Sequence, residues 1–175
     1  MILWFTGMSG SGKSAIAEQV EKKLANADYS VHYVDGDRFR AKTGIANKFS
    51  REEILENNYE IIDYCNSIKN DYDVIVVAVI SPFEVSRDKA RKIFGKDYKE
   101  IFIDCPIEIL IRRDTKGLYS RAKAGEITNL IGFSSSTPYE RPRNPDLMID
   151  TSKTTVAEGV EKVYKLITNS LVSNN

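Results

Sequence analysis

The sequence has few of the side chains that build disulfide frameworks or zinc sites: its 175 residues include only two cysteines and one histidine. Cys65 and Cys105 lie far apart and form no C-x-x-C pair, so we expect two buried free thiols of a reducing cytoplasm rather than a disulfide. His32 falls within a strand-like pattern, which predicts a place on a strand face rather than a part in catalysis. Two distant cysteines and one histidine do not form the ligand set of a zinc ion.

The sequence also lacks an excess of charge and any long apolar run. Lysine and arginine together number 25, as do aspartate and glutamate, so no basic field for a nucleic-acid partner is expected. No apolar stretch approaches the ~20 residues of a membrane span, and the N-terminal one is too short for a signal peptide. We therefore expect a cytoplasmic protein without nucleic-acid or membrane partners. Hydrophobic residues make up 42% of the chain, enough at this length for one domain with a substantial core.

What is present is a complete phosphate loop. Residues 7–14 read GMSGSGKS, which matches G-x-x-x-x-G-K-[ST], after a strand-like run at 2–6 and before helical periodicity at 15–24. In such a loop glycines let several N–H groups face one anion, Lys13 places its ammonium against the β- and γ-phosphates, and Ser14 offers its hydroxyl to Mg²⁺. The pattern predicts ATP and Mg²⁺ as cofactors. The expected phosphate-binding residues are Gly7, Ser9, Gly10, Ser11, Gly12, Lys13 and Ser14.

Strand and helix patterns alternate along the chain. The run DVIVVAVI is almost unbroken and β-branched, as in a central parallel strand covered on both faces. Ser50, followed by glutamates, indicates the N-cap of a helix, and Pro106 is expected at the first position of another. The alternation predicts a single α/β domain over 1–175, a three-layer α/β/α P-loop kinase fold with a parallel five-stranded sheet. The strands are expected at 2–6, 31–34, 73–80, 100–104 and 147–149, and the helices at 15–24, 50–69, 85–94, 106–113 and 155–171.

The segment from about 114 to 145 breaks this alternation. It is rich in lysine, arginine, glycine, serine and proline and shows little apolar periodicity. A long irregular segment inside a compact domain is usually functional or disordered. We interpret it as a lid over the phosphates of the bound nucleotide, the alternative being a solvated basic loop. Its cationic residues include Lys116, Arg121, Lys123, Arg141 and Arg143.

A second cluster of functional side chains follows the second expected strand. Asp35 and Asp37 would lie at its carboxyl end, the edge of a parallel sheet that lines the ligand crevice. There Asp35 would orient a Mg²⁺-bound water, and Asp37 would accept a proton from an attacking hydroxyl. Arg40, three residues on, would face the same side and hold an anionic acceptor, although the cluster is also typical of a structural turn. Ser81 is expected to be either a substrate contact or a plain turn residue, and Asp104 a local cap.

Together these motifs resemble the adenylyl-sulfate (APS) kinase family over nearly the whole chain. Besides the phosphate loop, the resemblance rests on D-G-D-x-x-R at 35–40, I-S-P at 80–82, R-D-x-K-G-L-Y at 113–119 and P-Y-E-x-P at 138–142. It implies an ATP- and Mg²⁺-dependent kinase that transfers the γ-phosphoryl group to a ribose 3′-hydroxyl, usually as a homodimer.

The resemblance also implies roles for individual residues. Asp37 is implied as the catalytic base and Asp35 as its Mg²⁺-holding neighbour. Lys13 and Lys116 would contact the phosphates, and Arg113 would pack on the adenine of ATP. The residues implied at the acceptor are Asp37, Arg40, Phe49, Asn57, Ile80, Ser81, Lys116, Gly117, Leu118, Tyr119 and Leu130.

The departures from the family lie where the acceptor would bind. After Phe49-Ser50 the family typically continues x-x-Asp-Arg-x-x-Asn-x-Arg-Arg, of which only Asn57 remains here. The positions at or near the missing arginines hold Ile54, Tyr59 and Glu60. Leu130 stands where the family has a phenylalanine that stacks on the acceptor's adenine, and Ser134 replaces an aspartate. Loss of a guanidinium that grips a charged ligand group costs a few kcal/mol if that group stays desolvated, and loss of base stacking costs about 1–3 kcal/mol in addition.

These departures predict a changed acceptor. They resemble a branch of the family that phosphorylates cytidine diphosphoramidate, a capsule-modification precursor, at its 3′-hydroxyl. That small ribonucleotide has a pyrimidine in place of adenine and a neutral amide in place of sulfate, which fits the lost arginines and phenylalanine. The alternatives are a true adenylyl-sulfate kinase of sulfate assimilation and, in another class, a catalytically silent nucleotide-binding regulator. Retention of Lys13, Asp35, Asp37 and Lys116 argues against the silent regulator.

Overall fold

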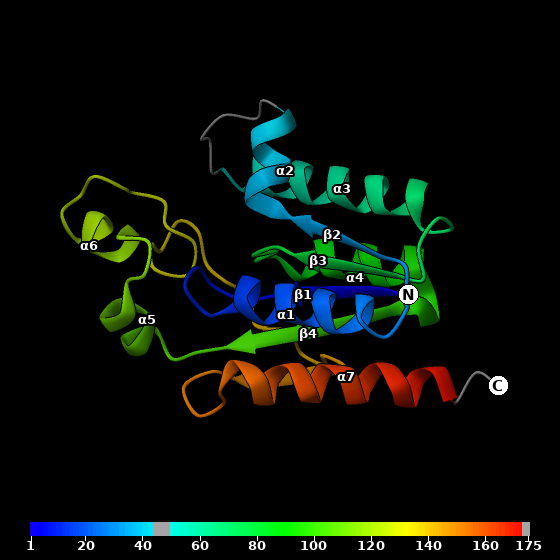
Figure 1. Ribbon diagram of the computed structural model, residues 1–175. Coiled ribbons are helices and arrows are strands. Elements are labelled where there is room, and N and C mark those ends of the chain that lie inside the picture. Colours follow the sequence, from blue (N-terminus) through cyan, green and yellow to red (C-terminus); the bar gives the residue numbers. More distant parts are fainter. Residues whose placement is uncertain (44–49, 173–175) are drawn as a thin grey trace.

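The computed structural model describes residues 1–43 and 50–172 of the chain. Five parallel strands form one sheet in the spatial order β2-β3-β1-β4-β5 (Figure 1). The strands are β1 (Ile2–Thr6), β2 (Val31–Asp35), β3 (Val74–Ala78), β4 (Tyr98–Asp104) and β5 (Leu147–Asp150). The expected parallel sheet is confirmed, and β1 and β3, in which every residue is buried, lie in its interior.

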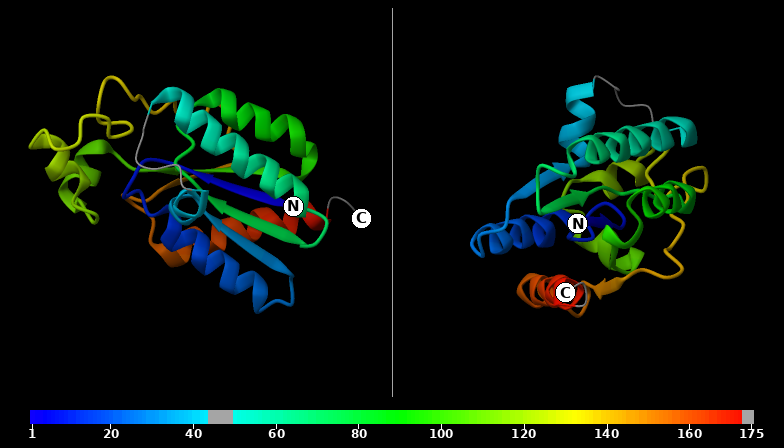
Figure 2. Two further views of the ribbon diagram at one scale, coloured as in Figure 1. Left: turned by 90° about the horizontal axis from the view of Figure 1, so that it is seen from above. Right: turned by 90° about the vertical axis from the view of Figure 1, so that its right-hand side faces the viewer.

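Helices cover both faces of the sheet. They are α1 (Lys13–Ala25), α3 (Arg51–Ile68), α4 (Glu84–Phe94) and α7 (Val156–Val172). Successive strand residues point to opposite faces: Leu3 and Phe5 pack in the core shared with α1 and α7, and Trp4 and Val77 in the core shared with α3 and α4. The two cores make the expected three-layer α/β/α arrangement (Figure 2).

Reciprocal hydrogen bonds fix the starts of α3 and α7. Ser50 Oγ accepts a hydrogen bond from the Glu53 N–H at 3.3 Å, and Glu53 Oε2 accepts one from the Ser50 N–H at 3.1 Å. Thr155 and Glu158 make the same pair of contacts at 3.3 and 2.8 Å. Such capping boxes satisfy N–H groups that the first turn of a helix leaves without partners. The expected starts of both helices therefore agree with the structure to within one residue.

The remaining elements are shorter. They are α2 (Gly36–Thr43), α5 (Ile107–Arg113), α6 (Leu118–Lys123) and a 3-10 turn, η1 (Gly95–Asp97). Beyond the carboxyl ends of the strands, α5 and α6 share a small apolar core that includes Leu110 and Tyr119 (Figure 1). The 114–145 segment is thus not wholly irregular, because α6 lies within it. Pro106 is the N-cap of α5 rather than its first helical residue, which corrects our expectation, because its ψ of 137° is not helical.

The cysteines and the histidine lie as expected. Cys65 and Cys105 are buried free thiols, and burial raises the pKa of Cys65 to about 12. His32 lies on β2, with its ring centroid 5.8 Å from that of Tyr64 and 4.8 Å from that of Tyr72. Within the described ranges, no helix combines the length and apolar character needed to cross a membrane.

Candidate active site

The phosphate loop leaves the carboxyl end of β1 and leads directly into α1. A Cβ at Gly7 would overlap the carbonyl oxygen of Ile103, so only glycine fits where the loop passes β4. Gly12 precedes α1 with a left-handed φ of +94°. The N–H of Ser11 donates a hydrogen bond to the Met8 carbonyl at 3.2 Å. The loop therefore curls back on itself and presents the N-terminus of α1, where N–H groups and the helix dipole favour an anion.

Two buried polar groups of this loop fit a bound triphosphate. Ser11 Oγ is buried and has no hydrogen-bond partner among the described residues. Lys13 is only 8% exposed, and its ammonium donates to the Met8 carbonyl at 2.8 Å. Burial, followed by the like charge of Lys116, lowers the pKa of Lys13 to about 7. An ATP phosphate would provide both the acceptor for Ser11 and the negative charge for Lys13.

We expect Mg²⁺ to be held by Ser14 and Asp35. Ser14 lies in the first turn of α1, and Asp35 ends β2. The described part of the chain contains no group of three or more histidine, cysteine, aspartate or glutamate side chains able to hold a metal ion. Mg²⁺ is usually bound by one or two protein oxygens together with substrate phosphates and water, so the sparse donor set fits this ion.

Asp35 is both a structural residue and a neighbour of the candidate base. Its Oδ1 accepts hydrogen bonds from the N–H groups of Asp37 at 3.0 Å and Arg38 at 2.9 Å, and so caps α2. The helix then carries Asp37 in its first turn and Arg40 one turn later. Asp35 can therefore be both a turn residue and part of the site, because its hydrogen bonds as the cap of α2 fix the backbone of Asp37, the candidate base.

Asp37 contacts the 114–145 segment through Lys116. Lys116 Nζ donates a hydrogen bond to Asp37 Oδ2 at 2.9 Å. Partial desolvation acts to raise the pKa of Asp37, but the hydrogen bond and charge of Lys116, with the charges of Arg40 and Lys13, outweigh it and hold the pKa below its usual value. Asp37 thus stays ionised, the form that a general base requires.

The R-D-x-K-G-L-Y motif is anchored to the phosphate loop at one end and to the loop after β5 at the other. The Tyr119 hydroxyl donates to the Ser9 carbonyl at 2.9 Å, with Tyr119 itself buried. Arg113 donates to the Thr151 carbonyl at 2.8 Å. Arg113 therefore lies beside the loop that follows β5, and its adenine contact stays a prediction.

The other predicted acceptor contacts lie on several elements. Asn57 of α3 is buried, and its Oδ1 has no partner among the described residues. Ser81 follows β3, is buried and has a left-handed φ of +42°. Gly117 and Leu118 begin α6, Leu130 packs near Tyr119, and Ile80 is half-buried beside Ile54. Phe49 lies outside the described residues. All of these assignments stay predictions.

Asp104 is not the local cap that we expected. Its two carboxylate oxygens accept hydrogen bonds from Arg141 at 2.9 and 2.7 Å. The Arg141 guanidinium also lies over the ring of Phe102, 5.0 Å from its centroid. The partner is 37 positions away in the chain, so local spacing did not reveal it. This bidentate pair fixes the returning end of the 114–145 segment to the end of β4.

Sequence reasoning missed a buried polar network behind Ser81. Arg87 of α4 donates to the carbonyls of Ser81 and Glu140, and the Tyr139 hydroxyl lies 2.8 Å from Thr6 Oγ1. The P-Y-E-x-P motif contains two of these residues and was the available signal. Nothing in the polar sequence of α4 marks Arg87 as one of its buried members.

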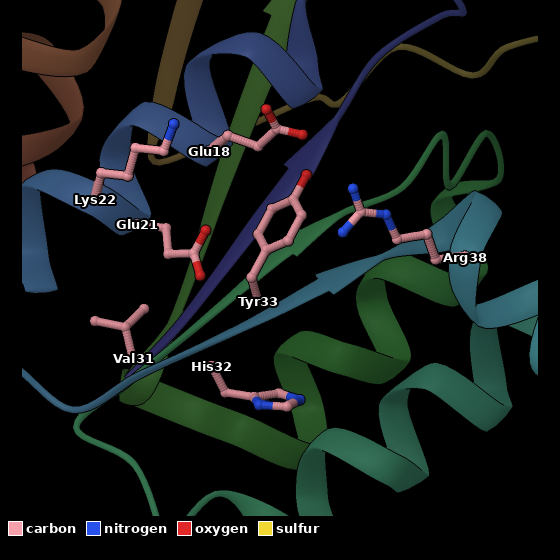
Figure 3. A pocket seen from close by; sticks show the side chains of 7 residues that line it. All are labelled: Glu18, Glu21, Lys22, Val31, His32, Tyr33 and Arg38. Atoms are coloured by element: carbon pink, nitrogen blue, oxygen red, sulfur yellow. The ribbon is translucent and has the colours of Figure 1, made fainter.

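A shallow pocket along β2 lies apart from the predicted site. Figure 3 shows the Tyr33 side chain pointing toward the gap between Glu18 and Arg38. Burial, and then the charges of Asp35 and Glu18, raise the pKa of Tyr33 above its usual value. None of the residues predicted to bind ATP or the acceptor lines this pocket, so we do not assign the chemistry to it.

Comparison with known proteins gives consistent matches. The family model described as adenylylsulphate kinase matches residues 1–150. The adenylyl-sulfate kinase of Clostridium kluyveri is 38% identical over 167 residues, 95% of this chain and 83% of that one. A probable adenylyl-sulfate kinase of Halalkalibacterium halodurans is 40% identical over 164 residues, with 93% and 80% covered. The structure of the Mycobacterium tuberculosis APS kinase CysC in complex with AMPPNP and APS superposes with a TM-score of 0.89 at 37% identity, covering 95% of this chain and 96% of that one.

Proposed function

Because this chain belongs to the adenylyl-sulfate kinase family, an ATP- and Mg²⁺-dependent group of phosphotransferases acting on a hydroxyl, we propose that it phosphorylates the 3′-hydroxyl of a ribonucleotide with a modified 5′-phosphate. The observation that carries this proposal is the contact of Lys116 with Asp37, which links the 114–145 segment to an ionised carboxylate. Adenylyl sulfate is the first candidate acceptor, since the similar proteins are adenylyl-sulfate kinases.

The residues divide the work of the transfer. Asp37 accepts the proton of the attacking hydroxyl, and Lys13 and Lys116 offset the negative charge of the phosphates. When bound, Mg²⁺ neutralises charge on the β- and γ-phosphate oxygens, and Ser14 and Asp35 would hold it. The 114–145 segment acts as a lid that excludes water, so that the phosphoryl group reaches the acceptor rather than water.

Cytidine diphosphoramidate is a second candidate, and the polar side chains of α3 favour it. Within α3 the only cationic side chain is that of Arg51. Asn57 Oδ1 and Glu60 Oε2 are buried acceptor atoms without hydrogen-bond donors among the described residues. They are three positions apart, so they lie on one side of the helix. A sulfate group brings only further acceptors to such atoms, whereas the nitrogen of a phosphoramidate brings N–H donors.

A coupled assay of ADP release with a panel of acceptors tests the proposal. The panel contains adenylyl sulfate, cytidine diphosphoramidate and unmodified nucleoside 5′-diphosphates. Turnover at micromolar adenylyl sulfate selects the first candidate, and preferential turnover of the phosphoramidate selects the second. Absence of acceptor-dependent turnover with every compound contradicts the proposal and favours a silent nucleotide-binding regulator.

Substitution on α3 then separates the two acceptors. If Glu60 receives an N–H of the phosphoramidate, Glu60→Gln raises the KM for that acceptor and leaves the KM for ATP unchanged. Glu56→Gln is the matched control, because Glu56 is an exposed glutamate of the same helix. Equal effects of the two substitutions contradict the second candidate.

We further propose that the chain works as a cytoplasmic homodimer of a single-domain subunit. The dimer is what the family resemblance implies, and the two free thiols suit a reducing compartment. Light scattering tests the dimer, which requires a mass twice the 19.8 kDa of one chain.

A further inference from the structure

Arg87 is a fully buried arginine outside the predicted catalytic groups. It lies on α4, is 1% exposed, and its Nε is 2.9 Å from Oε1 of Glu100, which is also buried; the two atoms form an ion pair without hydrogen-bond geometry. A buried guanidinium is strongly unfavourable unless its charge and its donors all find partners. A pair of buried hydrophobic side chains would have filled the same space at lower cost, so the other contacts of Arg87 are informative.

The two ends of the Arg87 guanidinium bind two separate loops. Nη1 donates to the Ser81 carbonyl and Nη2 to the Glu140 carbonyl, each at 2.7 Å. Ser81 lies three residues after the end of β3, and Glu140 belongs to the returning part of the 114–145 segment. One planar group therefore holds the end of a central strand and the end of the proposed lid at a fixed separation.

The backbone of Ser81 is strained, and Arg87 is one of the contacts that hold it. Its φ of +42° is unfavourable for a residue with a side chain. Such strain persists only where the surroundings determine the conformation, and it clusters at functional sites. The Ser81 carbonyl also accepts a longer hydrogen bond, of 3.3 Å, from Thr6 Oγ1.

The two segments that Arg87 binds lie between the phosphate loop and Asp37, which form the two halves of the proposed site. In the sheet, β3 lies between β1, which leads to the phosphate loop, and β2, which leads to Asp37. Thr6, at the end of β1, donates to the Ile80 carbonyl at 2.6 Å and lies 2.8 Å from the Tyr139 hydroxyl. The Glu140 carboxylate accepts from the N–H of Glu84, the first residue of α4, at 2.7 Å. The network thus joins β1, β3, α4 and the returning segment.

We propose that Arg87 is a positioning residue for the acceptor. By binding the Ser81 and Glu140 carbonyls, it fixes the two segments that contain them, and these segments form the wall between the phosphate loop and Asp37. This inference rests on the proposed function, because it takes that wall to be part of the acceptor site. The clamp acts through backbone atoms, so Arg87 itself need not touch either substrate.

The decisive variant is Arg87→Lys, with Arg91→Lys as its matched control. Lysine keeps the positive charge beside Glu100 but does not reach two carbonyls with a planar fork. Arg91 also pairs with Glu100, at 3.0 Å, but its second ion pair is with Asp146 rather than with the carbonyls of Ser81 and Glu140. Both variants keep a positive charge beside Glu100 but change the geometry of its ion pairs, and only the first removes the hydrogen bonds to the Ser81 and Glu140 carbonyls.

The expected result is a split between the two substrates. In Arg87→Lys the KM for the acceptor rises about tenfold or more, while the KM for ATP stays within about twofold; Arg91→Lys changes neither. Hydrogen exchange of the amides of residues 81, 83–86 and 139–141 is faster in Arg87→Lys than in Arg91→Lys. Equal changes in both KM values, or the same behaviour in both variants, overturn the inference.

Two further comparisons keep the outcome unambiguous. If Arg87→Lys does not fold, Tyr139→Phe replaces it, because this substitution removes one hydroxyl of the same network. It is expected to raise the acceptor KM about threefold. The control is Tyr98→Phe, at a buried tyrosine near Trp4, which should leave the acceptor KM unchanged. An unchanged acceptor KM in Tyr139→Phe overturns the inference. If the wild-type protein turns over no acceptor, the proposed function fails, and the exchange comparison still decides whether Arg87 clamps the two segments.

Discussion

Lys116 Nζ lies 2.9 Å from Asp37 Oδ2, so the 114–145 segment contacts the first turn of α2. Both side chains are more than half exposed, and an ion pair of this kind contributes at most about 1 kcal/mol to stability. The ion pair therefore matters for the chemistry of the site rather than for stability. It brings a cation of the proposed lid against the proposed base and holds that base ionised.

Asp37→Asn is expected to lower kcat about 10²–10⁴-fold, because asparagine cannot accept the hydroxyl proton. The affinity for ATP should change little, since the phosphate loop is untouched, and the melting temperature should change little because the pair is exposed. Steady-state kinetics, ATP titration and thermal unfolding measure the three quantities. Asp63→Asn, at an exposed aspartate of α3, serves as the control. Activity within about tenfold of the wild type would remove Asp37 from the role of base.

Lys116→Met is expected to move the acidic limb of the kcat/KM–pH profile to higher pH. Lys116 lowers the pKa of Asp37 through its hydrogen bond and its charge, so its loss lets that pKa rise. At a given acidic pH more of Asp37 is then protonated and unable to act as a base. Only the position of the limb is informative, because loss of the lysine also weakens phosphate binding. A limb that stays in place, or moves as far in Lys123→Met, contradicts the assignment.

ATP binding is expected to take up a proton at Lys13. Burial lowers the pKa of this lysine to about 7 in the free protein, so at pH 8 it is mostly neutral, whereas a bound triphosphate favours the charged form. Uptake should thus be most of one proton at pH 8 and slight at pH 6. Calorimetry in buffers with different ionisation enthalpies measures it. The result is contradicted if binding enthalpy at pH 8 is independent of the buffer, or if Lys13→Met shows the same dependence.

The sequence predicted the parts of the molecule that short-range chemistry determines. The phosphate loop follows from glycine and lysine spacing, the buried β3 from an unbroken β-branched run, and the start of α3 from Ser50 and Glu53. In each case the interacting residues are within a few positions of one another, or every residue of the element has the same environment. Such features are visible in one sequence without knowledge of the fold.

The features that the sequence did not predict depend on contacts between distant parts of the chain. Asp104 pairs with Arg141, and Arg87 with the carbonyl of Glu140, only because the fold brings these distant segments together. The helix α6 was missed for a similar reason. Its stability comes from packing of residues such as Tyr119 in the small core beside α5 rather than from a long amphipathic pattern.

Gly132→Ala and Gly125→Ala form a matched pair that tests the contact between the 114–145 segment and the phosphate loop. Both glycines have a φ of +78°, so alanine at either position adds about 1–2 kcal/mol of backbone strain. A Cβ at Gly125 would meet open space, whereas one at Gly132 would overlap the sulfur of Met8. Only Gly132→Ala therefore requires the side chain of a phosphate-loop residue, Met8, to move.

The expected difference appears in ATP binding as well as in stability. The Met8 carbonyl accepts the hydrogen bond of Lys13, so if the Met8 side chain couples the two segments, its shift moves this carbonyl and raises the KM for ATP several-fold in Gly132→Ala. Gly125→Ala should lower the free energy of unfolding by the strain alone and leave the KM unchanged. Chemical denaturation and ATP-dependent kinetics of both variants measure these effects. If both substitutions change stability and KM equally, the side chain of Met8 does not couple the two segments.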